Sequence, residues 1–390
     1  FLAGSALSGA APSMGFFLVA RGIQGVGAGA LMTTAFTIVG DLYDMEARAR
    51  IQGYLSGVWG VAAVVGPLIG GSLVATVGWR WIFYLNIPVG LAAAHFVFHR
   101  LRESGYPREG AGLDLVGGTF FSGAVLLLLL GLKLEGAWMA VALVAAAGSA
   151  ALFLLRERRG PDPMFDPRIF RIRLMNVANA CGLLAGAVLL SLSAFLPVYV
   201  MNVRGGTAIQ SGLMLTPISA GWILAATFGG RLLLRVPLRA LVIPGFCLLT
   251  VATYFVSRIG PETSWWPIVG TLFVIGVSFG LSFTTLLVAV QERSGVEIRG
   301  QATSAVQFFR QIGGALGVAA LEVVYLSRLS DPSLLESAPG RILTAAERTE
   351  LMTGFAAAFL LATAFAAAAA AASVAIPRRE HSFHSPGTPT

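Results

Sequence analysis

The sequence predicts an all-α integral membrane protein that crosses the bilayer many times. Of its 390 residues, 56% are hydrophobic and only 12% are charged, whereas an ordinary soluble domain has about 25% charged residues. Apolar runs of about 20 residues, the length that a membrane-spanning helix needs, follow one another along the chain. We interpret these runs as helices, because a lone strand in lipid leaves its backbone polar groups without partners.

The apolar runs predict one partial span followed by eleven whole ones. Residues 1–11 are already apolar and follow no charged leader, so the chain is expected to begin inside a span. The whole spans are predicted at about 15–40, 51–76, 81–98, 113–132, 136–155, 174–201, 209–230, 238–257, 265–290, 299–325 and 351–376.

The loops between these spans share the basic residues unequally. Eighteen lie on one side of the membrane and seven on the other, and Arg21 and Arg310, which lie within spans, complete the 27 Lys and Arg residues. Cytoplasmic loops hold the excess of basic residues, so the richer side, which includes the C-terminal tail, is predicted to be cytoplasmic. The net charge of +8 is therefore a topology signal, and no nucleic-acid partner is expected.

The two arginines within spans are the first candidate functional residues. An arginine at the bilayer centre costs about 2.5–3.5 kcal/mol on insertion scales, so it faces a cavity or a partner. The alternative is a hydrogen bond between helices that only stabilises the bundle. Gln311 follows Arg310, and Glu322 is the one acidic residue well within a predicted span. Glu322 is a candidate cavity residue or, alternatively, a solvated helix end.

Small residues and helix ends give further expectations. Glycines four residues apart let helices approach closely, and proline inside a helix removes a hydrogen bond and bends it. Gly66-Pro67 is thus expected at a tight, bendable helix contact. Asp114 is expected to open a helix, where a carboxylate is favoured by the positive dipole end. The glycine pairs at this spacing are Gly25 and Gly29, Gly53 and Gly57, Gly66 and Gly70, Gly276 and Gly280, and Gly313 and Gly317.

The sequence contains no pattern that indicates an enzyme. It has no P-loop lysine motif, so ATP is not the expected energy source. His95 and His99 have no third ligand nearby along the chain. The two cysteines both lie inside apolar runs. We therefore expect no cofactor and no metal site.

The sequence contains the stretches RGIQGVGA at 21–28, GPLIGG at 66–71, WRWIFYLNIPVG at 79–90 and RQIGGALG at 310–317. These four stretches resemble motifs of the fourteen-span drug:proton antiporters of the major facilitator superfamily. RGIQGVGA at 21–28 is similar to the R-x-x-Q-G-x-G-A motif of the fourth span, and GPLIGG at 66–71 to the G-P-x-x-G-G core of the fifth-span antiporter motif. WRWIFYLNIPVG at 79–90 and RQIGGALG at 310–317 look like two further runs of that family. The residues that match the first two motifs are Arg21, Gln24, Gly25, Gly27, Gly66, Pro67, Gly70 and Gly71.

The resemblance implies a major facilitator fold with two six-helix halves, an extra central helix pair, and the first two and a half spans missing. Residues 1–98 would form a partial N-terminal half with spans 3–6. Residues 99–173 would hold the central pair, spans 7–8, with cytoplasmic linkers. Residues 174–376 would form the C-terminal half with spans 9–14, and 377–390 a disordered cytoplasmic tail.

The resemblance also implies a function. The protein would lie in the plasma (inner) membrane and export lipophilic or cationic drugs in exchange for protons, by alternating access. Arg21 would stabilise the charged form of a nearby carboxylate, expected in the missing first span. The implied partners are a small-molecule substrate, protons, lipid and, as an open option, a periplasmic adaptor. The alternatives are export of a metabolite or siderophore, uptake by symport, or a non-functional fragment of such a transporter.

Overall fold

The computed structural model describes residues 1–43, 45–100, 114–132, 134–159, 167–233, 235–331 and 343–377, and this part of the chain contains helices and no strands. The elements are α1 (Leu2–Gly9), α2 (Met14–Leu42), α3 (Met45–Thr76), α4 (Trp81–Tyr84), α5 (Asn86–Arg100), α6 (Leu115–Gly131), α7 (Gly136–Arg159), α8 (Pro167–Arg171), α9 (Arg173–Val198), η1 (Tyr199–Val203), α10 (Ala208–Leu213), α11 (Thr216–Leu233), α12 (Leu238–Ser257), α13 (Trp265–Phe279), η2 (Gly280–Thr284), α14 (Thr285–Arg293), α15 (Gly295–Leu326) and α16 (Ala345–Ser373).

In the described part, nine helical segments are long and apolar enough to cross a membrane. Each coincides with a predicted span, so the all-α membrane class is confirmed. Two of the eleven predicted whole spans are not among the nine: α6, which is apolar but has 17 residues, and α3, which has 32. Apart from Pro377, the predicted tail at 377–390 lies outside the described residues.

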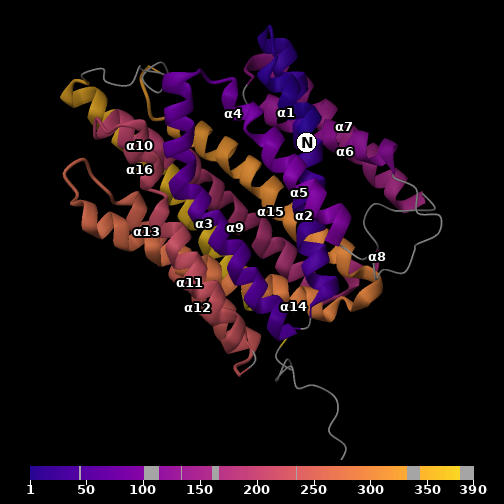
Figure 1. The fold of residues 1–390 in the computed structure, drawn as a ribbon. Coiled ribbons are helices and arrows are strands. Elements are labelled where there is room, and N and C mark those ends of the chain that lie inside the picture. Colours follow the sequence, from indigo (N-terminus) through magenta and orange to yellow (C-terminus); the bar gives the residue numbers. More distant parts are fainter. Residues whose placement is uncertain are drawn as a thin grey trace, which may run out of the picture.

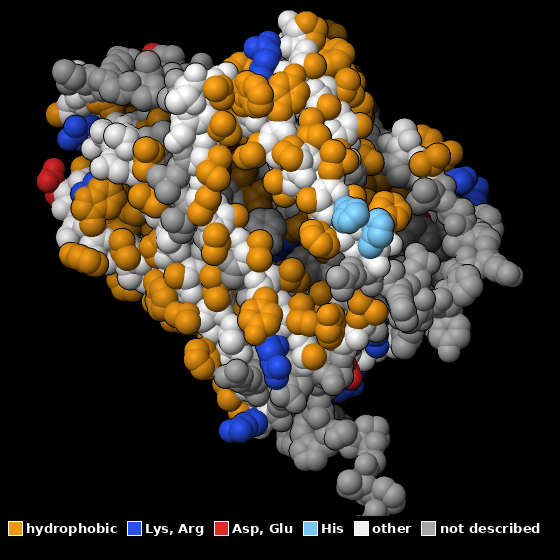
Figure 2. Space-filling view, in the orientation of Figure 1, with side chains coloured by type: hydrophobic (Ala, Val, Ile, Leu, Met, Phe, Trp, Pro, Cys, Tyr) orange, Lys and Arg blue, Asp and Glu red, His pale blue; other side chains and the backbone are white. Residues whose placement is uncertain are grey.

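Among the described residues, the main cluster of buried hydrophobic side chains lies between Ile169 and Ile376. A few further buried hydrophobic residues, such as Ala20 and Phe153, lie before it. In Figure 1, α9 and α15 run through the centre, α11 to α13 lie on one side of them, and α6 and α7 on the other. In the segment Trp265–Arg293, 78% of the most apolar stretch is buried, against 0% in Trp81–His99. Hydrophobic side chains cover much of the face in Figure 2, as expected where lipid tails are as apolar as leucine.

Two of the predicted glycine pairs mark close helix contacts. A Cβ at Gly313 or Gly317 would clash with α9 at Leu183 or Ala187, and one at Gly276 or Gly280 would clash with α11. Without a side chain, these glycines let the helix backbones touch. The packing prediction is confirmed for both pairs.

Two other pairs make no such close contact with the described residues, so for them packing stays a prediction. A Cβ added at Gly25, Gly29, Gly66 or Gly70 would meet nothing within 4 Å. The helix α3 packs on α11, but no described residue lies against the side that bears Gly66 and Gly70. The spacing fixes which residues share a helix face, and it does not determine whether another helix covers that face.

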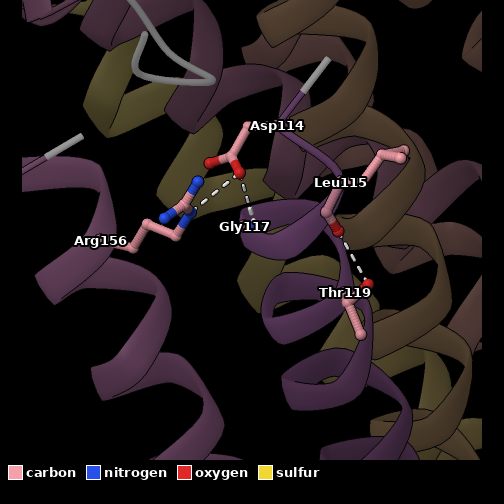
Figure 3. A network of polar contacts seen from close by, with 5 residues as sticks. All are labelled: Asp114, Leu115, Gly117, Thr119 and Arg156. Carbon is pink, nitrogen blue, oxygen red and sulfur yellow. Dashed lines mark hydrogen bonds and ion pairs between the residues drawn. The ribbon is translucent and has the colours of Figure 1, made fainter. Parts of the chain in front are cut away.

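Asp114 confirms the expected helix opening and also joins α6 to α7 (Figure 3). Its Oδ1 accepts from the backbone N–H of Gly117 and from Nε of Arg156, each at 2.9 Å. The Gly117 N–H, followed by the Arg156 guanidinium, holds the pKa of Asp114 below its ordinary value. The contact between the two helix ends is therefore complete above the ordinary pKa of an aspartate and is lost only as pH falls through the lowered value.

We expect this contact to be insensitive to pH in the neutral range. Spin labels on Val116→Cys and Leu155→Cys, in a Cys247→Ser background, should give one narrow distance distribution at about pH 8 and about pH 5. The change Asp114→Asn should broaden it at both values, because the amide attracts Arg156 less than a carboxylate does. If the distance distribution of the protein that keeps Asp114 broadens between about pH 8 and about pH 5, the lowered pKa of Asp114 is contradicted.

Candidate functional site

A cavity of about 420 Å³ lies between the N-terminal and C-terminal parts of the chain. On one side it is lined by Met32 of α2 and by Leu55 and Ala62 of α3. On the other side, it is lined by residues of α9, α11, η2, α14 and α15. Its lining has ten apolar and six polar residues. Ligand sites for drug-sized molecules have about 300–1,000 Å³ and this kind of mostly apolar lining.

The aromatic wall of the cavity depends on the π-helical turn η2. Gly280 lies directly against α11, because a Cβ there would sit only 2.7 Å from the carbonyl oxygen of Trp222. This approach brings Nε1 of Trp222 within 3.0 Å of Thr284 Oγ1, to which it donates a hydrogen bond. The Trp222 ring also stacks on Phe279 at 5.3 Å. Single π turns inside α-helices are frequent at functional sites, and this one directs Phe283 and Thr284 to the cavity.

Arg310 is the buried cation of the site. Arg310 is 8% exposed. Its Nε donates a hydrogen bond to Gln307 Oε1 at 3.0 Å, and its guanidinium lies 5.3 Å from the centre of the Phe283 ring. The backbone at Arg310 is fixed as well, since a Cβ at Gly186 of α9 would clash with its carbonyl. The close α9–α15 contact thus positions the charge.

Only two of the three cavity candidates from the sequence lie at this cavity. Arg310 and Gln311 are among its lining residues, and Glu322 is not. Glu322 is 12 residues beyond Arg310 on α15, which is about 18 Å along the helix axis. Gln307 was missed, although its position three residues before Arg310 places both on one helix face. Trp222, Phe283 and Thr284 sit in apolar runs whose pattern does not mark them.

A second polar cluster surrounds Arg21. Its Nη1 donates to Gln24 Oε1, and the amide of Gln24 donates to Ser5 Oγ of α1 at 2.6 Å. Asn86, at the start of α5, donates to the same hydroxyl at 3.1 Å. The Arg21 guanidinium also lies 5.7 Å from the centre of the Phe83 ring. One serine therefore links two of the motif stretches, 21–28 and 79–90, through Gln24 and Asn86.

Arg21 is exposed, whereas Gln24 is 4% exposed. Among the described residues Arg21 makes no ion pair, and it does not line the cavity. Of the motif glycines, Gly27 lies against Phe1, while no described residue would lie within 4 Å of a Cβ at Gly25, Gly66, Gly70 or Gly71. Ser5 was missed because the sequence contains no pattern that pairs a serine of one span with residues of two others.

The chain resembles transporters in both sequence and fold. It is 31% identical over 338 residues to the Multidrug transporter protein MdtP of Bacillus subtilis, covering 84% of this chain and 62% of that protein. It is 30% identical to Multidrug resistance protein 3 of the same organism, covering 82% and 63%. The chain thus spans less than two thirds of the length of these relatives.

Among solved structures, the human organic anion transporter MFSD10 has a similar fold. The TM-score is 0.58 at 18% identity, and the match covers 94% of this chain and 75% of that one. At this identity the likeness concerns the fold alone. The family model described as the Major Facilitator Superfamily matches residues 1–318. The relatives are transporters and not enzymes, and the same holds for this chain. The chain belongs to the Major Facilitator Superfamily.

Proposed function

We propose that this chain acts in a proton-coupled secondary transporter that exports lipophilic small molecules by alternating access. The observation that carries the proposal is the cavity shared by α2 and α3 on one side and by α9, α11, η2, α14 and α15 on the other. In secondary transporters the substrate site lies between two parts that rock against each other. The two relatives named as a multidrug transporter and a multidrug resistance protein support drugs as the substrate class, and export is the direction that we propose.

The proposal includes the arrangement of the chain. Residues 1–98 belong to one half, 174–376 form the other, and 99–173 contribute the central helix pair between them. The main buried hydrophobic cluster, which spans Ile169 to Ile376 among the described residues, supports treating the C-terminal half as one packed unit. We place the C-terminus in the cytoplasm, on the side with the excess of basic loop residues.

Protons supply enough free energy for this task. One proton entering through 100 mV and one pH unit provides about 2.3 plus about 1.4 kcal/mol. At about 1.4 kcal/mol per decade, this supports a substrate gradient of several hundred-fold for each proton. We assign the coupling role to Arg21, which would hold the proton-carrying carboxylate in its charged form and release it when the helices move. Gln24 and Ser5 fix the position of Arg21 for that role.

Dye efflux from cells that express the full-length protein tests the proposal. Preloaded cells should lose lipophilic dyes and drugs from a panel faster than cells with an empty vector. A protonophore should remove the difference, because it dissipates the gradient that drives export. Efflux that continues at the same rate under protonophore would contradict proton coupling, and a panel with no exported compound would contradict drug export.

A further inference from the structure

We propose that the cavity at Arg310 takes lipophilic organic acids, and that it holds their anionic group between Arg310 and Gln307. The inference rests on the proposed export function and specifies the charge of its substrates. Arg310 is the one charged residue among the described residues that line the cavity. No carboxylate among the described residues pairs with Arg310, and a buried cation of this kind strongly favours an anion over a second cation at the same place.

The hydrogen-bond donors of the site point to the same ligand. Arginine has only donors, so the oxygen of the Gln307 amide must face Arg310 Nε, which fixes the orientation of the amide. The Nε2 of Gln307 is then a buried donor with no hydrogen-bond partner among the residues that the structure describes. In the described part of the chain the terminal guanidinium nitrogens of Arg310 likewise make no hydrogen bond. Two side chains therefore offer free donors, and a carboxylate or sulfonate, which only accepts, satisfies both.

The remaining lining fits the rest of such a molecule. Trp222, Phe283, Leu189, Leu190, Ile218 and Leu287 form the apolar wall. Phe283 lies beside the Arg310 guanidinium. A ligand could therefore place its aromatic body against Phe283 while its acidic group contacts Arg310. The ligand class is thus a drug-sized amphiphile with an apolar or aromatic body and one acidic group. This substrate class differs from the one that the sequence resemblance implied, which was lipophilic or cationic drugs.

Two fluorescent probes with the same dansyl group test the charge preference. Dansylglycine has a carboxylate and dansylcadaverine has an amine, and both can be titrated against the full-length protein in lipid nanodiscs. We expect dansylglycine to bind at least about tenfold more tightly. The change Arg310→Gln should weaken dansylglycine by at least about tenfold and leave dansylcadaverine unchanged or tighter. Arg258→Gln, at an exposed arginine after α12, is the matched control and should change neither.

The change Gln307→Glu gives a second test that keeps the fold. Its carboxylate can still accept from Arg310 Nε, but it neutralises the site, so the preference for dansylglycine over dansylcadaverine should be lost. Arg310→Lys should retain part of the preference for dansylglycine, since the charge stays and the planar fork is lost. Size-exclusion elution and Tm identify variants that do not fold.

The proposal is overturned if the unaltered protein binds dansylcadaverine as tightly as dansylglycine, or binds neither. It is also overturned if Arg310→Gln weakens both probes equally, or if Gln307→Glu leaves the preference as it was. Failure of proton-driven efflux, with the charge preference intact, would remove the proposed function and not this site. Intact efflux without the preference would do the reverse.

Discussion

Replacing Arg21 by alanine is expected to abolish most proton-driven export while leaving expression and membrane insertion unchanged. Arg21 is exposed, so alanine leaves no buried hole. Its proposed partner would lose a charged hydrogen bond, which is worth about 1.5–3 kcal/mol. The initial rate of dye efflux should therefore fall by about tenfold to about a hundredfold. The measurement is protonophore-sensitive efflux at matched amounts of protein in the membrane.

Two further variants separate charge from packing at this position. Arg21→Lys should keep part of the rate, because the charge remains and the planar donor group is lost. Arg258→Ala, which removes an exposed arginine from the loop after α12, should export at the unaltered rate. Full efflux by Arg21→Ala would reduce Arg21 to a helix-packing residue that bonds Gln24.

The change Gly313→Leu is expected to destabilise the C-terminal part of the protein and to lower its Tm. A Cβ at Gly313 already clashes with the backbone of Leu183 in α9, and backbone cannot move aside as a flexible side chain can. Overpacking costs typically about 1–3 kcal/mol and occasionally more, and a protein has only about 5–15 kcal/mol of stability. Size-exclusion chromatography and thermal unfolding in detergent measure the loss.

Gly70→Leu is the matched control for that experiment. It introduces the same side chain into a helix at a glycine four residues from another glycine, but its Cβ would meet nothing within 4 Å. We expect a Tm close to that of the unaltered protein. Equal destabilisation by both changes would show that the α9–α15 contact is not what makes Gly313 sensitive.

Spans are well predicted by apolar runs, because lipid selects for length and hydrophobicity. The predicted span at 238–257 matches α12, Leu238–Ser257. Helix ends that leave the apolar region are less visible: α3 begins at Met45, six residues before the predicted 51, since Arg48 and Arg50 interrupt the pattern without breaking the helix. The capping box of Thr344 and Glu347 does mark the start of α16, yet the apolar run alone suggested 351.

The candidate site was less predictable than the spans. Arg21 and Arg310 were found because a lone arginine in an apolar span is easy to recognise. The sequence did not show that the two arginines belong to separate polar clusters and that only Arg310 lines the cavity. The π-helical turn at Gly280–Thr284 packs closely on α11, and no pattern in the sequence predicts it. The bonds of Ser5 to Gln24 and Asn86 join three separate spans, which a pattern within one span cannot express.

Substrate-driven proton movement in proteoliposomes tests proton-coupled export most directly. The full-length protein is reconstituted into vesicles that contain a pH-sensitive dye, without any imposed proton gradient. When an exported compound from the cell panel is added to one side, the account predicts an immediate pH change inside the vesicles. The direction should be that of protons moving against the substrate, and Arg21→Ala should remove most of the change. Substrate transport with no proton movement, in vesicles shown to hold a pH gradient, would contradict the account.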